Sequence, residues 1–411
     1  MGLINFITAT VKLWLKGDRY YWAWIIFLGI LILSGCLAYI DQLSDGLTLT
    51  NMRDPISWGF YIGNFTFLVG VAAAAIMLVI PAYIYDWGPI KEVVLLGELL
   101  AISAIVMCFL FVTVDIGRPD RVMHIMPFLG TLNFPSSLLA WDILVLNAYF
   151  LLNVVIAGHI IYMGFKGKHY NKKIVIPLVL LSVPSAVSIH TVTAFLYNGI
   201  AARPFWNASI LAPRFLASAF CSGPAVLLIL FQILRKTEGL KIKDAALHKI
   251  AELMSYAMFI NVFLLGAEVF KEYYSHTEHL VFTQVLFSSV QGKTEVHYFM
   301  WPALACSLIA FLLFLIPKTR ENVYTMNIGC ILIFFGVYVE KGMGLVIPGL
   351  TPDTLGEIYQ YTPSLTEYRV ASGIFAIGFL VFTLLVKMAI PFSMRELGGE
   401  QSGDQSHASH G

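Results

Sequence analysis

Charged residues are scarce in this sequence. Only 12% of the 411 residues are Asp, Glu, Lys or Arg, whereas a soluble domain carries about 25%. Hydrophobic residues make up 58% of the chain, and the mean hydropathy is +0.77. This composition excludes an ordinary soluble enzyme and predicts an all-α integral membrane protein. The net charge of +1 shows no excess of basic residues, and no nucleic-acid partner is expected.

Cysteine motifs are also absent. The five cysteines fall singly inside apolar segments, at Cys36, Cys108, Cys221, Cys306 and Cys330. No CxxC, CxxCH or ferredoxin-type run is present, so the chain has no motif for an iron–sulfur cluster or for covalently attached haem. We expect no metal site and no redox centre of its own.

Haem b is the main alternative use of the membrane histidines. It needs two axial histidines that face each other at one depth of a bundle. His190 with His297, or His159 with His248, would satisfy this on paper. Neither pair has a spacing that favours haem over ordinary buried histidines, so we expect no haem.

Long apolar runs dominate what is present. A span needs about 20 apolar residues, and ten segments qualify, at 21–40, 56–85, 93–116, 137–165, 174–196, 210–234, 247–274, 298–316, 327–346 and 368–390. Residues 1–20 read as a cytoplasmic, amphipathic lead-in to a ten-helix membrane domain over 21–395. The polar tail, 396–411, is expected to be disordered. The two longest outer loops are expected at 275–297 and 341–367.

The basic residues indicate the orientation. Ten spans put both termini on one side, and 17 of the 26 Lys and Arg residues then fall on that side. The positive-inside rule places both termini in the cytoplasm, and the expected location is the bacterial inner membrane.

The spans show a loose internal repeat. Segments 56–196 and 210–346 each open with a helix in which aromatic residues precede small ones, and each has a second helix that ends in charges on the outer side. We expect two four-helix bundles, flanked by the first and last spans.

One cluster of charges stands at the end of a span, in FVTVDIGRPDRVMHI (111–125). Proline ends the helix here, which leaves Asp115 and Arg118 at the edge of the hydrocarbon. A charge in this position is costly unless it is paired, hydrated or functional. His190 is expected at a similar depth, roughly 10 Å below the outer surface. The alternatives are an interfacial salt bridge that pins a loop, or a polar pocket for a quinone, where a histidine beside a carboxylate suits proton exchange.

Four further acids lie within spans and are candidate stations of a proton pathway. Glu98 is on the inner side, whereas Asp142, Glu268 and Glu340 lie further out. Acids inside a membrane are functional candidates by default, although Glu268 also has a local ion-pair partner available in Lys271.

Several motifs carry a resemblance to a known family. SWGFYIGN, VDIGRPDR, SIHTVTAFLYN, ARPFWNASILAPRFLASAFCSGPA and TPDTLGEIYQYTPSLTEYRVASGIF occur in this order over nearly the whole chain. The sequence thereby resembles the NrfD/polysulfide reductase (PsrC-like) membrane subunits. It is most similar to those of menaquinone reductase (Qrc-type) complexes, with the DsrP-type subunit as the second choice.

The resemblance implies a site and partners. A subunit of this kind binds menaquinone near the periplasmic face and takes electrons from a periplasmic iron–sulfur protein. The implied further partners are a molybdopterin-oxidoreductase-like subunit and a multihaem cytochrome c. The quinone-pocket positions of the family match Asn64, Asp115, Arg118 and His190, and we add Thr193 and Arg203 from the same outer level. His190 and Asp115 are the predicted catalytic pair.

The predicted function is therefore menaquinone reduction near the periplasmic face, coupled to proton uptake or to proton translocation from the cytoplasm. Three alternatives remain open: a DsrP-like menaquinol-oxidising subunit, a secondary transporter and a passive membrane anchor. The polar residues gather near the outer face rather than at the midplane, which argues against a transporter.

Overall fold

The fold was analysed in a computed structural model that describes residues 2–85, 87–91, 93–126, 128–276 and 279–394. These residues contain no β-strand, only an isolated bridge between Arg53 and Ile56. Ten of the helical segments are long and apolar enough to cross a membrane. The predicted all-α membrane fold is confirmed. The predicted tail, 396–411, lies outside the described residues.

The helices follow one another with few long connections. Their bounds are α1 (Leu3–Trp14), α2 (Arg19–Asp45), η1 (Gly46–Leu49), α3 (Phe60–Ala72), α4 (Ala74–Val79), the π-helical η2 (Ile80–Ile84), α5 (Gly88–Lys91), α6 (Val94–Asp115), η3 (Pro119–Ile125), α7 (Leu138–Phe165), α8 (Lys172–Asn198), α9 (Leu211–Thr237), α10 (Asp244–Ser275), α11 (Leu280–Phe287), α12 (His297–Leu315), α13 (Pro317–Arg320), α14 (Val323–Lys341), α15 (Met343–Leu350), α16 (Leu365–Ala389) and the π-helical η4 (Ile390–Met394).

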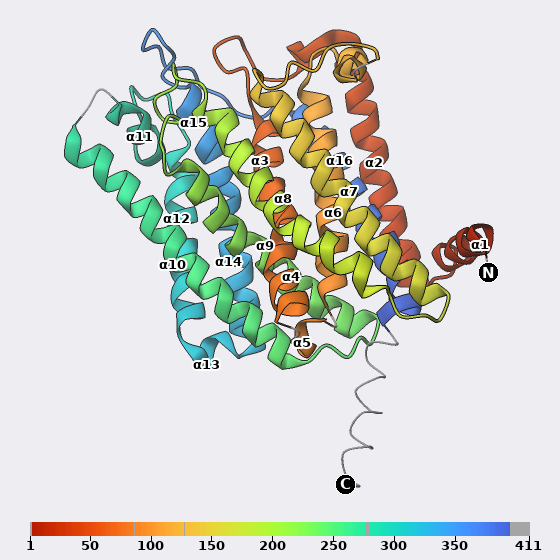
Figure 1. The fold of residues 1–411 in the computed structure, drawn as a ribbon. Coiled ribbons are helices and arrows are strands. Elements are labelled where there is room, and N and C mark those ends of the chain that lie inside the picture. Colours follow the sequence, from red (N-terminus) through yellow and green to blue (C-terminus); the bar gives the residue numbers. More distant parts are fainter. Residues whose placement is uncertain (1, 86, 92, 127, 277–278, 395–411) are drawn as a thin grey trace.

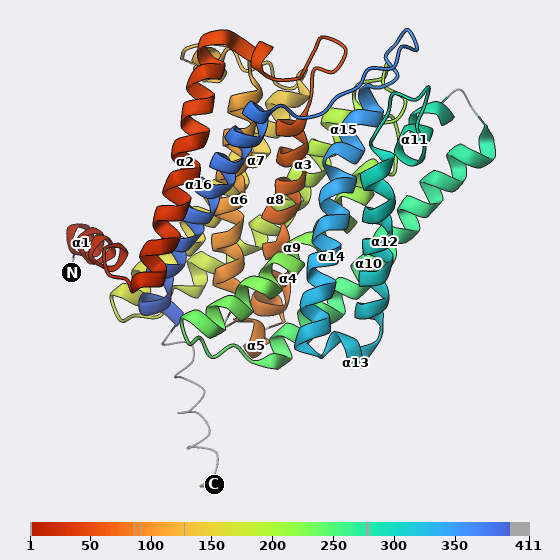
Figure 2. The same ribbon diagram turned by 180° about the vertical axis from the view of Figure 1, so that it is seen from behind.

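Two four-helix bundles stand side by side (Figures 1 and 2). Helices α3, α6, α7 and α8 form the first bundle, and α9, α10, α12 and α14 form the second. They meet where α9 packs against α3 and α8, and where α14 reaches α3. Helices α2 and α16 pack against each other and, through α16, against α6. This is the arrangement expected from the sequence, whereas the internal repeat itself stays a prediction.

Two spans are interrupted. In the second span, α3 gives way at Ala73 to α4 and then to the π-helical turn η2, where Tyr85 N–H bonds to Ile80 O over 3.3 Å. Pro81 opens this turn, because proline cannot continue an α-helical hydrogen-bond ladder. Pro184 and Pro224 lie inside the continuous helices α8 and α9 and break neither of them.

The ninth span is interrupted at Gly342, between α14 and α15. The expected outer loop over 341–367 is therefore wrong at its start. Lys341 is the last residue of α14 and is only 3% exposed, and the chain continues as a helix to Leu350. The apolar segment of α15 packs into the protein instead of crossing open solvent, which the loop assignment did not anticipate.

Helix α1 lies across one end of the membrane domain (Figure 1). Its Phe6 ring packs against three aromatic rings of α7 and η4, those of Tyr162, Phe165 and Phe392. Trp14 Nε1 donates to the carbonyl of Leu384 over 3.0 Å. The lead-in expected from the sequence is thus a helix fixed to the last span.

Helices α2 and α16 touch through two glycines. A methyl group added at Gly35 would lie 2.8 Å from the Cα of Gly373. Close backbone approach between membrane helices depends on such small residues.

Gly35→Leu is expected to push α2 away from α16 and to destabilise the protein by about 1–3 kcal/mol, the usual cost of overpacking. The measurement is the thermal melting temperature of the purified chain. Gly29→Leu on the same helix is the control, because nothing lies within 4 Å of its added methyl position. Equal melting of the two variants would contradict the close packing.

Candidate functional site

A cleft of about 390 Å³ lies where the two bundles meet, at the end of the molecule that the predicted orientation places outside. We call it the outer cleft. Its walls come from α3, α12, α14, α15 and the segment 359–363. Phe299, Phe335 and Tyr368 line it and are exposed on the flank of the protein, so the cleft opens where lipid surrounds a membrane protein. A hydrogen bond from Gln360 Nε2 to Glu295 Oε1, 2.8 Å long, crosses its outer rim.

Asn64 and Tyr338 are the polar pair of the outer cleft. The Asn64 amide donates one N–H to Phe60 O over 2.7 Å, and its Oδ1 accepts from the Tyr338 hydroxyl over 2.8 Å. The second amide N–H of Asn64 and the lone pairs of the Tyr338 oxygen stay available. An apolar wall with a donor and an acceptor at one point is the usual form of a site for a small aromatic ligand.

Next to this pair, Tyr361 and Glu367 link α3 and α16 at the wall of the cleft. The Tyr361 hydroxyl donates to Glu367 and accepts from Phe60 N–H over 2.8 Å. Burial and the nearby Glu367 carboxylate raise the pKa of Tyr361, which keeps the phenol protonated as a donor. Glu367 is fully buried and also caps α16 through a reciprocal bond with Ser364.

Asp115 is the last residue of α6 and does not line the outer cleft; it lies near Tyr61 of α3. Its Oδ1 is buried without a hydrogen-bond partner among the described residues. The Tyr61 hydroxyl donates to Gln42 over 2.8 Å, and Gln42 in turn donates to Val114 O. This places an unpartnered carboxylate oxygen next to a short polar chain.

Arg118 does not pair with Asp115, contrary to expectation. Its guanidinium makes a two-point bond to Asp120, at 3.0 and 2.9 Å, and both side chains are exposed. This bond lowers the pKa of Asp120 and raises that of Arg118. Because Asp120 is two residues away and in water, the pair forms without the desolvation that a bond to Asp115 would need.

His190 is 1% exposed, on α8, and does not line the outer cleft. Its Nδ1 bonds to Ala186 O over 3.0 Å, while its Nε2 has no hydrogen-bond partner among the described residues. It borders a separate small cavity at the junction of the bundles. Among the described residues, His190 and Asp115 therefore line no common cavity.

The last two predicted quinone-site residues have other partners. Thr193 donates to Asp142 Oδ1 over 2.8 Å, and both side chains are buried. Arg203 Nη1 donates to Leu350 O over 3.1 Å, at the end of α15. Among the six predicted residues, Asn64 is the one that lines the outer cleft.

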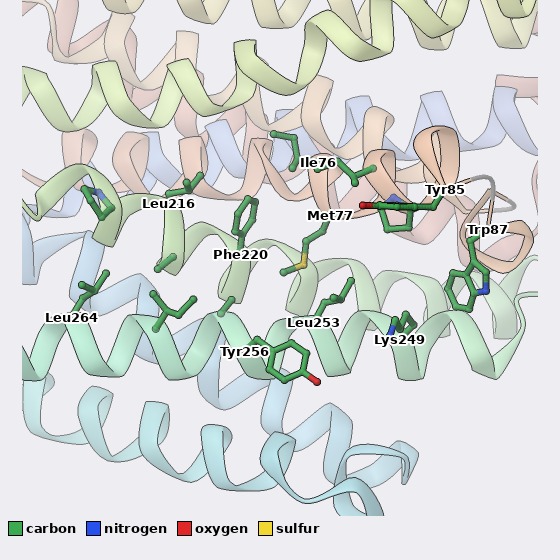
Figure 3. Close-up of a pocket in the computed structure, with 16 residues that line it drawn as sticks. Ile76, Met77, Tyr85, Trp87, Leu216, Phe220, Lys249, Leu253, Tyr256 and Leu264 are labelled. Carbon is green, nitrogen blue, oxygen red and sulfur yellow. The ribbon is translucent and has the colours of Figure 1, made fainter.

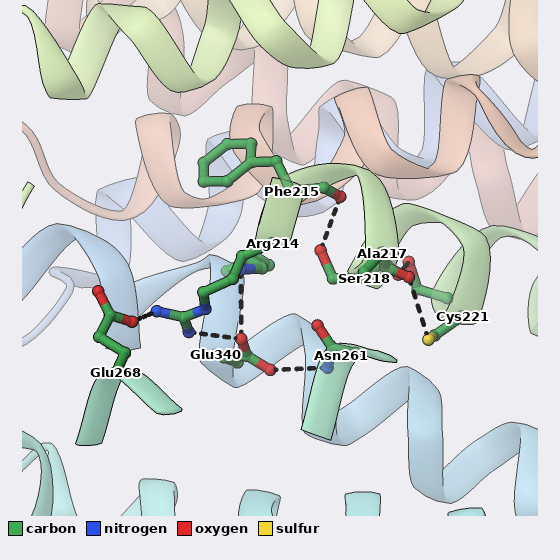
Figure 4. A network of polar contacts seen from close by, with 10 residues as sticks. Arg214, Phe215, Ala217, Ser218, Cys221, Asn261, Glu268 and Glu340 are labelled. Atoms are coloured by element: carbon green, nitrogen blue, oxygen red, sulfur yellow. Dashed lines mark hydrogen bonds and ion pairs between the residues drawn. The ribbon is translucent and has the colours of Figure 1, made fainter. Parts of the chain in front are cut away.

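The predicted proton-pathway acids separate into different environments. Glu268 and Glu340 belong to an ion-pair network around Arg214 in the second bundle (Figure 4). Arg214 pairs with Glu268 and, over 2.8 Å, with Glu340, and Asn261 donates to Glu340 Oε2 over 3.4 Å. Lys271 pairs with Glu272 over 3.0 Å. The network holds two cations and two anions once Lys341, 3.2 Å from Glu340, is counted.

Glu98 stands alone in the first bundle. It is 1% exposed, and neither carboxylate oxygen has a hydrogen-bond partner among the described residues. Tyr83 and Tyr149 are its nearest titratable neighbours by electrostatic interaction. Together with the Asp142–Thr193 pair, it gives the first bundle two buried acids at different depths.

A groove of about 800 Å³, larger than the outer cleft, runs along α10 and faces α9 and the interrupted second span (Figure 3). Its walls are almost entirely apolar, as in Met77, Phe220 and Leu264, and its polar groups lie toward the end that carries Lys249 and Trp87. Its lining has no paired donor and acceptor comparable to Asn64 and Tyr338 among the described residues. The groove suits a hydrocarbon chain rather than a redox headgroup.

Sequence reasoning missed Tyr338, Lys341 and Tyr361. The first two lie in GVYVEKGMG, where an adjacent Glu and Lys sit inside an apolar run. This adjacency was the available signal, because a lysine is rarely buried in hydrocarbon without a function. No cluster of three or more His, Cys, Asp or Glu able to hold a metal ion occurs among the described residues.

Ten helices long and apolar enough to cross a membrane, eight of them in two bundles, with a lipid-facing cleft at one end, define a polytopic integral membrane protein. The sequence profile of the family described as "Polysulphide reductase, NrfD" matches residues 48–352. The chain belongs to this family, whose members are membrane subunits of quinone-interacting oxidoreductase complexes.

Three curated relatives align over most of their length. A putative dimethyl sulfoxide reductase membrane subunit of Halobacterium salinarum is 26% identical, over 87% of this chain and 88% of the relative. A selenate reductase subunit of Mesobacillus selenatarsenatis is 22% identical, over 93% and 96%. An Hdr-like menaquinol oxidoreductase integral membrane subunit of Archaeoglobus fulgidus is 23% identical, over 91% and 94%.

Arg214→Met is expected to destabilise the protein by roughly 3–5 kcal/mol, because it leaves two buried carboxylates without their shared cation. Arg118→Ala is the matched control, since it breaks an exposed pair and should leave the melting temperature nearly unchanged. Thermal melting of the two purified variants checks the contrast. A stable Arg214→Met protein would show that the network is dispensable for folding.

Proposed function

We propose that this chain is the quinone-binding membrane subunit of a respiratory oxidoreductase and that it reduces menaquinone in the outer cleft. The observation that carries the proposal is the cleft itself: apolar, open to the flank of the protein, and holding Asn64 and Tyr338 at one point. A passive anchor has no need of such a cleft. The aromatic rings of Phe299, Phe335 and Tyr368 would pack against the flat ring system of the quinone.

The two polar groups have distinct roles in this proposal. The free N–H of Asn64 donates to a quinone carbonyl oxygen, and the Tyr338 hydroxyl holds the amide in the orientation that points this N–H into the cleft. Reduction to the hydroquinone takes two electrons and two protons. The electrons come from an iron–sulfur protein docked on the outer, periplasmic end. Glu295 and Gln360 form the rim of the cleft that lies between this protein and the quinone.

The protons come through buried groups of the first bundle. Asp115, with its free Oδ1, and His190, with its free Nε2, are the proposed proton donors on the outer side. Glu98 is the proposed inner station, and the Asp142–Thr193 pair is a further proposed station on the outer side, one helical turn from His190. Uptake through Glu98 from the cytoplasm would make the reaction electrogenic.

The relatives support this assignment by their names, which describe membrane subunits of reductases and a menaquinol oxidoreductase. We propose the bacterial inner membrane, with both termini in the cytoplasm. The proposed further partners are a molybdopterin-oxidoreductase-like subunit and a multihaem cytochrome c. The Archaeoglobus relative's name favours the reverse reaction, menaquinol oxidation, as the second candidate, and the same cleft would serve it.

A secondary transporter is the candidate from another class, and the interrupted second and ninth spans favour it. Against it stand the outer position of the cleft and the almost entirely apolar lining of the groove along α10. Solute accumulation by the purified chain in vesicles, without any electron donor, would favour the transporter.

Asn64→Leu is expected to weaken binding of a soluble naphthoquinone to the purified chain by about tenfold or more, because one buried hydrogen bond is worth about 1.5 kcal/mol or less and the leucine also narrows the cleft. Tyr338→Phe should have a smaller effect in the same direction. Asn153→Leu is the matched control: Asn153 is equally buried and makes the same bond to the carbonyl four residues earlier, outside the cleft. Equal binding by all variants would remove the cleft as the quinone site.

Glu98→Gln tests the origin of the protons. The substitution preserves shape and is expected to abolish proton uptake from the inner compartment when the assembled complex reduces menaquinone in proteoliposomes. Internal pH, followed with an entrapped dye, is the measurement. If inner-compartment uptake persists in Glu98→Gln, or is absent in the wild-type complex, Glu98 is not a station of the pathway.

A further inference from the structure

A small cavity of about 10 Å³ lies at the junction of the two bundles. Four helices contribute to it: α3 with Thr66 and Gly70, α8 with His190, α9 with Ser218 and Ser222, and α14 with Lys341. It is distinct from the outer cleft, although both border α3 and α14. A volume of this size holds about one water molecule.

Two residues of the cavity wall carry a buried nitrogen atom without a hydrogen-bond partner among the described residues: Nε2 of His190, and Nζ of Lys341, which has an ion-pair contact with Glu340. The hydroxyls of the wall are already engaged. Ser218 donates to Phe215 O and Ser222 to Ser218 O, over 2.9 and 3.2 Å, and Thr66 donates to Ile62 O. Unpartnered buried polar groups cost roughly 1–3 kcal/mol each, which favours a bound water between them.

The two atoms are complementary. A carbonyl oxygen only accepts, so the contact of His190 Nδ1 with Ala186 O requires the proton on Nδ1 and leaves Nε2 of the neutral ring as an acceptor. Lys341 carries three N–H donors, of which one faces Glu340, 3.2 Å away. A water in the cavity can therefore accept from Lys341 and donate to His190 at the same time.

We propose that this cavity binds one water molecule, which bridges Lys341 and His190 and passes protons from the ion-pair network of the second bundle to the histidine of the first. In the transfer step, an Nζ–H bond of Lys341 breaks as the water accepts the proton, and the water gives one of its own protons to Nε2. Lys341 becomes neutral and His190 becomes an imidazolium that keeps its Nδ1–H on Ala186. The transfer step rests on the proposed function, whereas the water site does not.

The surrounding charges suit this transfer. With Lys341 protonated, the network of Arg214, Glu268, Glu340 and Lys341 is neutral (Figure 4). After the transfer it carries one negative charge, next to the new positive charge on His190. The proton thus moves without leaving an isolated charge in a medium of low dielectric constant.

Gly70→Ala tests the proposal. An added methyl group at Gly70 would lie 3.7 Å from the nearest atom of Ala219 and 3.8 Å from Ser222 Oγ, at ordinary contact distance, so it fills the cavity without a clash. Gly158→Ala is the control for the gain of a methyl group on a helix, because nothing lies within 4 Å of that position. Ser222→Ala enlarges the same cavity and should keep the water.

The first measurement is a structure of the assembled complex at a resolution that shows ordered water. We expect a peak within about 2.7–3.2 Å of both nitrogen atoms in the wild type, Gly158→Ala and Ser222→Ala, and none in Gly70→Ala. A dry cavity in the wild type would overturn the proposal.

The second measurement is the rate of menaquinone reduction by the same samples, with thermal melting to verify folding. Gly70→Ala should lose about tenfold or more of the rate, as expected for a lost proton-transfer step. A folded Gly70→Ala complex that lacks the water but keeps the full rate would overturn the transfer step. A wild-type complex that reduces no menaquinone would refute the proposed function and, with it, the transfer step. The water site would then still be tested by the presence or absence of the water peak.

Discussion

Lipid offers no hydrogen-bond partners, and this constraint shapes every polar feature inside the bundles. The Arg214 network shows the usual solution, in which opposite charges cancel within a few ångströms. Most buried hydroxyls take another route and donate to the carbonyl of the preceding helical turn, as Ser103 and Ser222 do. Against this background, ten buried side-chain atoms of the described residues lack a hydrogen-bond partner, and those of Glu98, Asp115 and His190 in the first bundle are among them. Groups that the fold leaves unsatisfied in this way are the natural candidates for exchanging protons.

The contact between α3 and α14 unites these features. Gly63 permits it, since a methyl group at this position would lie 3.3 Å from the backbone of Gly342. On one side of the contact, Asn64 and Tyr338 face the outer cleft. Thr66 and Lys341 of the same two helices border the small cavity. Because α3 belongs to the first bundle and α14 to the second, a quinone in the cleft would sit where both bundles influence it.

Much of the architecture was predictable from the sequence, because long apolar runs leave the chain few alternatives in a bilayer. The ten spans and the two flanked bundles follow from the length of these runs and their charged ends. Which charged residues pair with each other could not be predicted from the sequence in the same way. Arg118 selects Asp120 rather than Asp115, and Glu268 selects Arg214 rather than the nearby Lys271. Both pairings depend on which side chains are exposed to water. The depth of a residue along a span does not predict this exposure.

The candidate site, too, could be predicted from the sequence only in part. Asn64 lines the outer cleft, whereas His190, on α8, borders a different cavity, because residues at a similar depth can face different neighbours. Quinone binding by either residue stays a prediction. Tyr338 and Lys341 were missed although both lie in the expected span 327–346, because the sequence does not show which side chains of a helix line a cavity. A helix that restarts after a single glycine cannot be told from a loop by composition alone.

The packing of α1 against the last span has a consequence for biogenesis. Trp14 bonds to Leu384, a residue 370 positions later, and Phe6 packs against Phe392. At roughly 5–20 residues per second, the ribosome needs about 20–70 s to make the intervening chain. Helix α1 therefore waits for the tenth span to be inserted before it can dock.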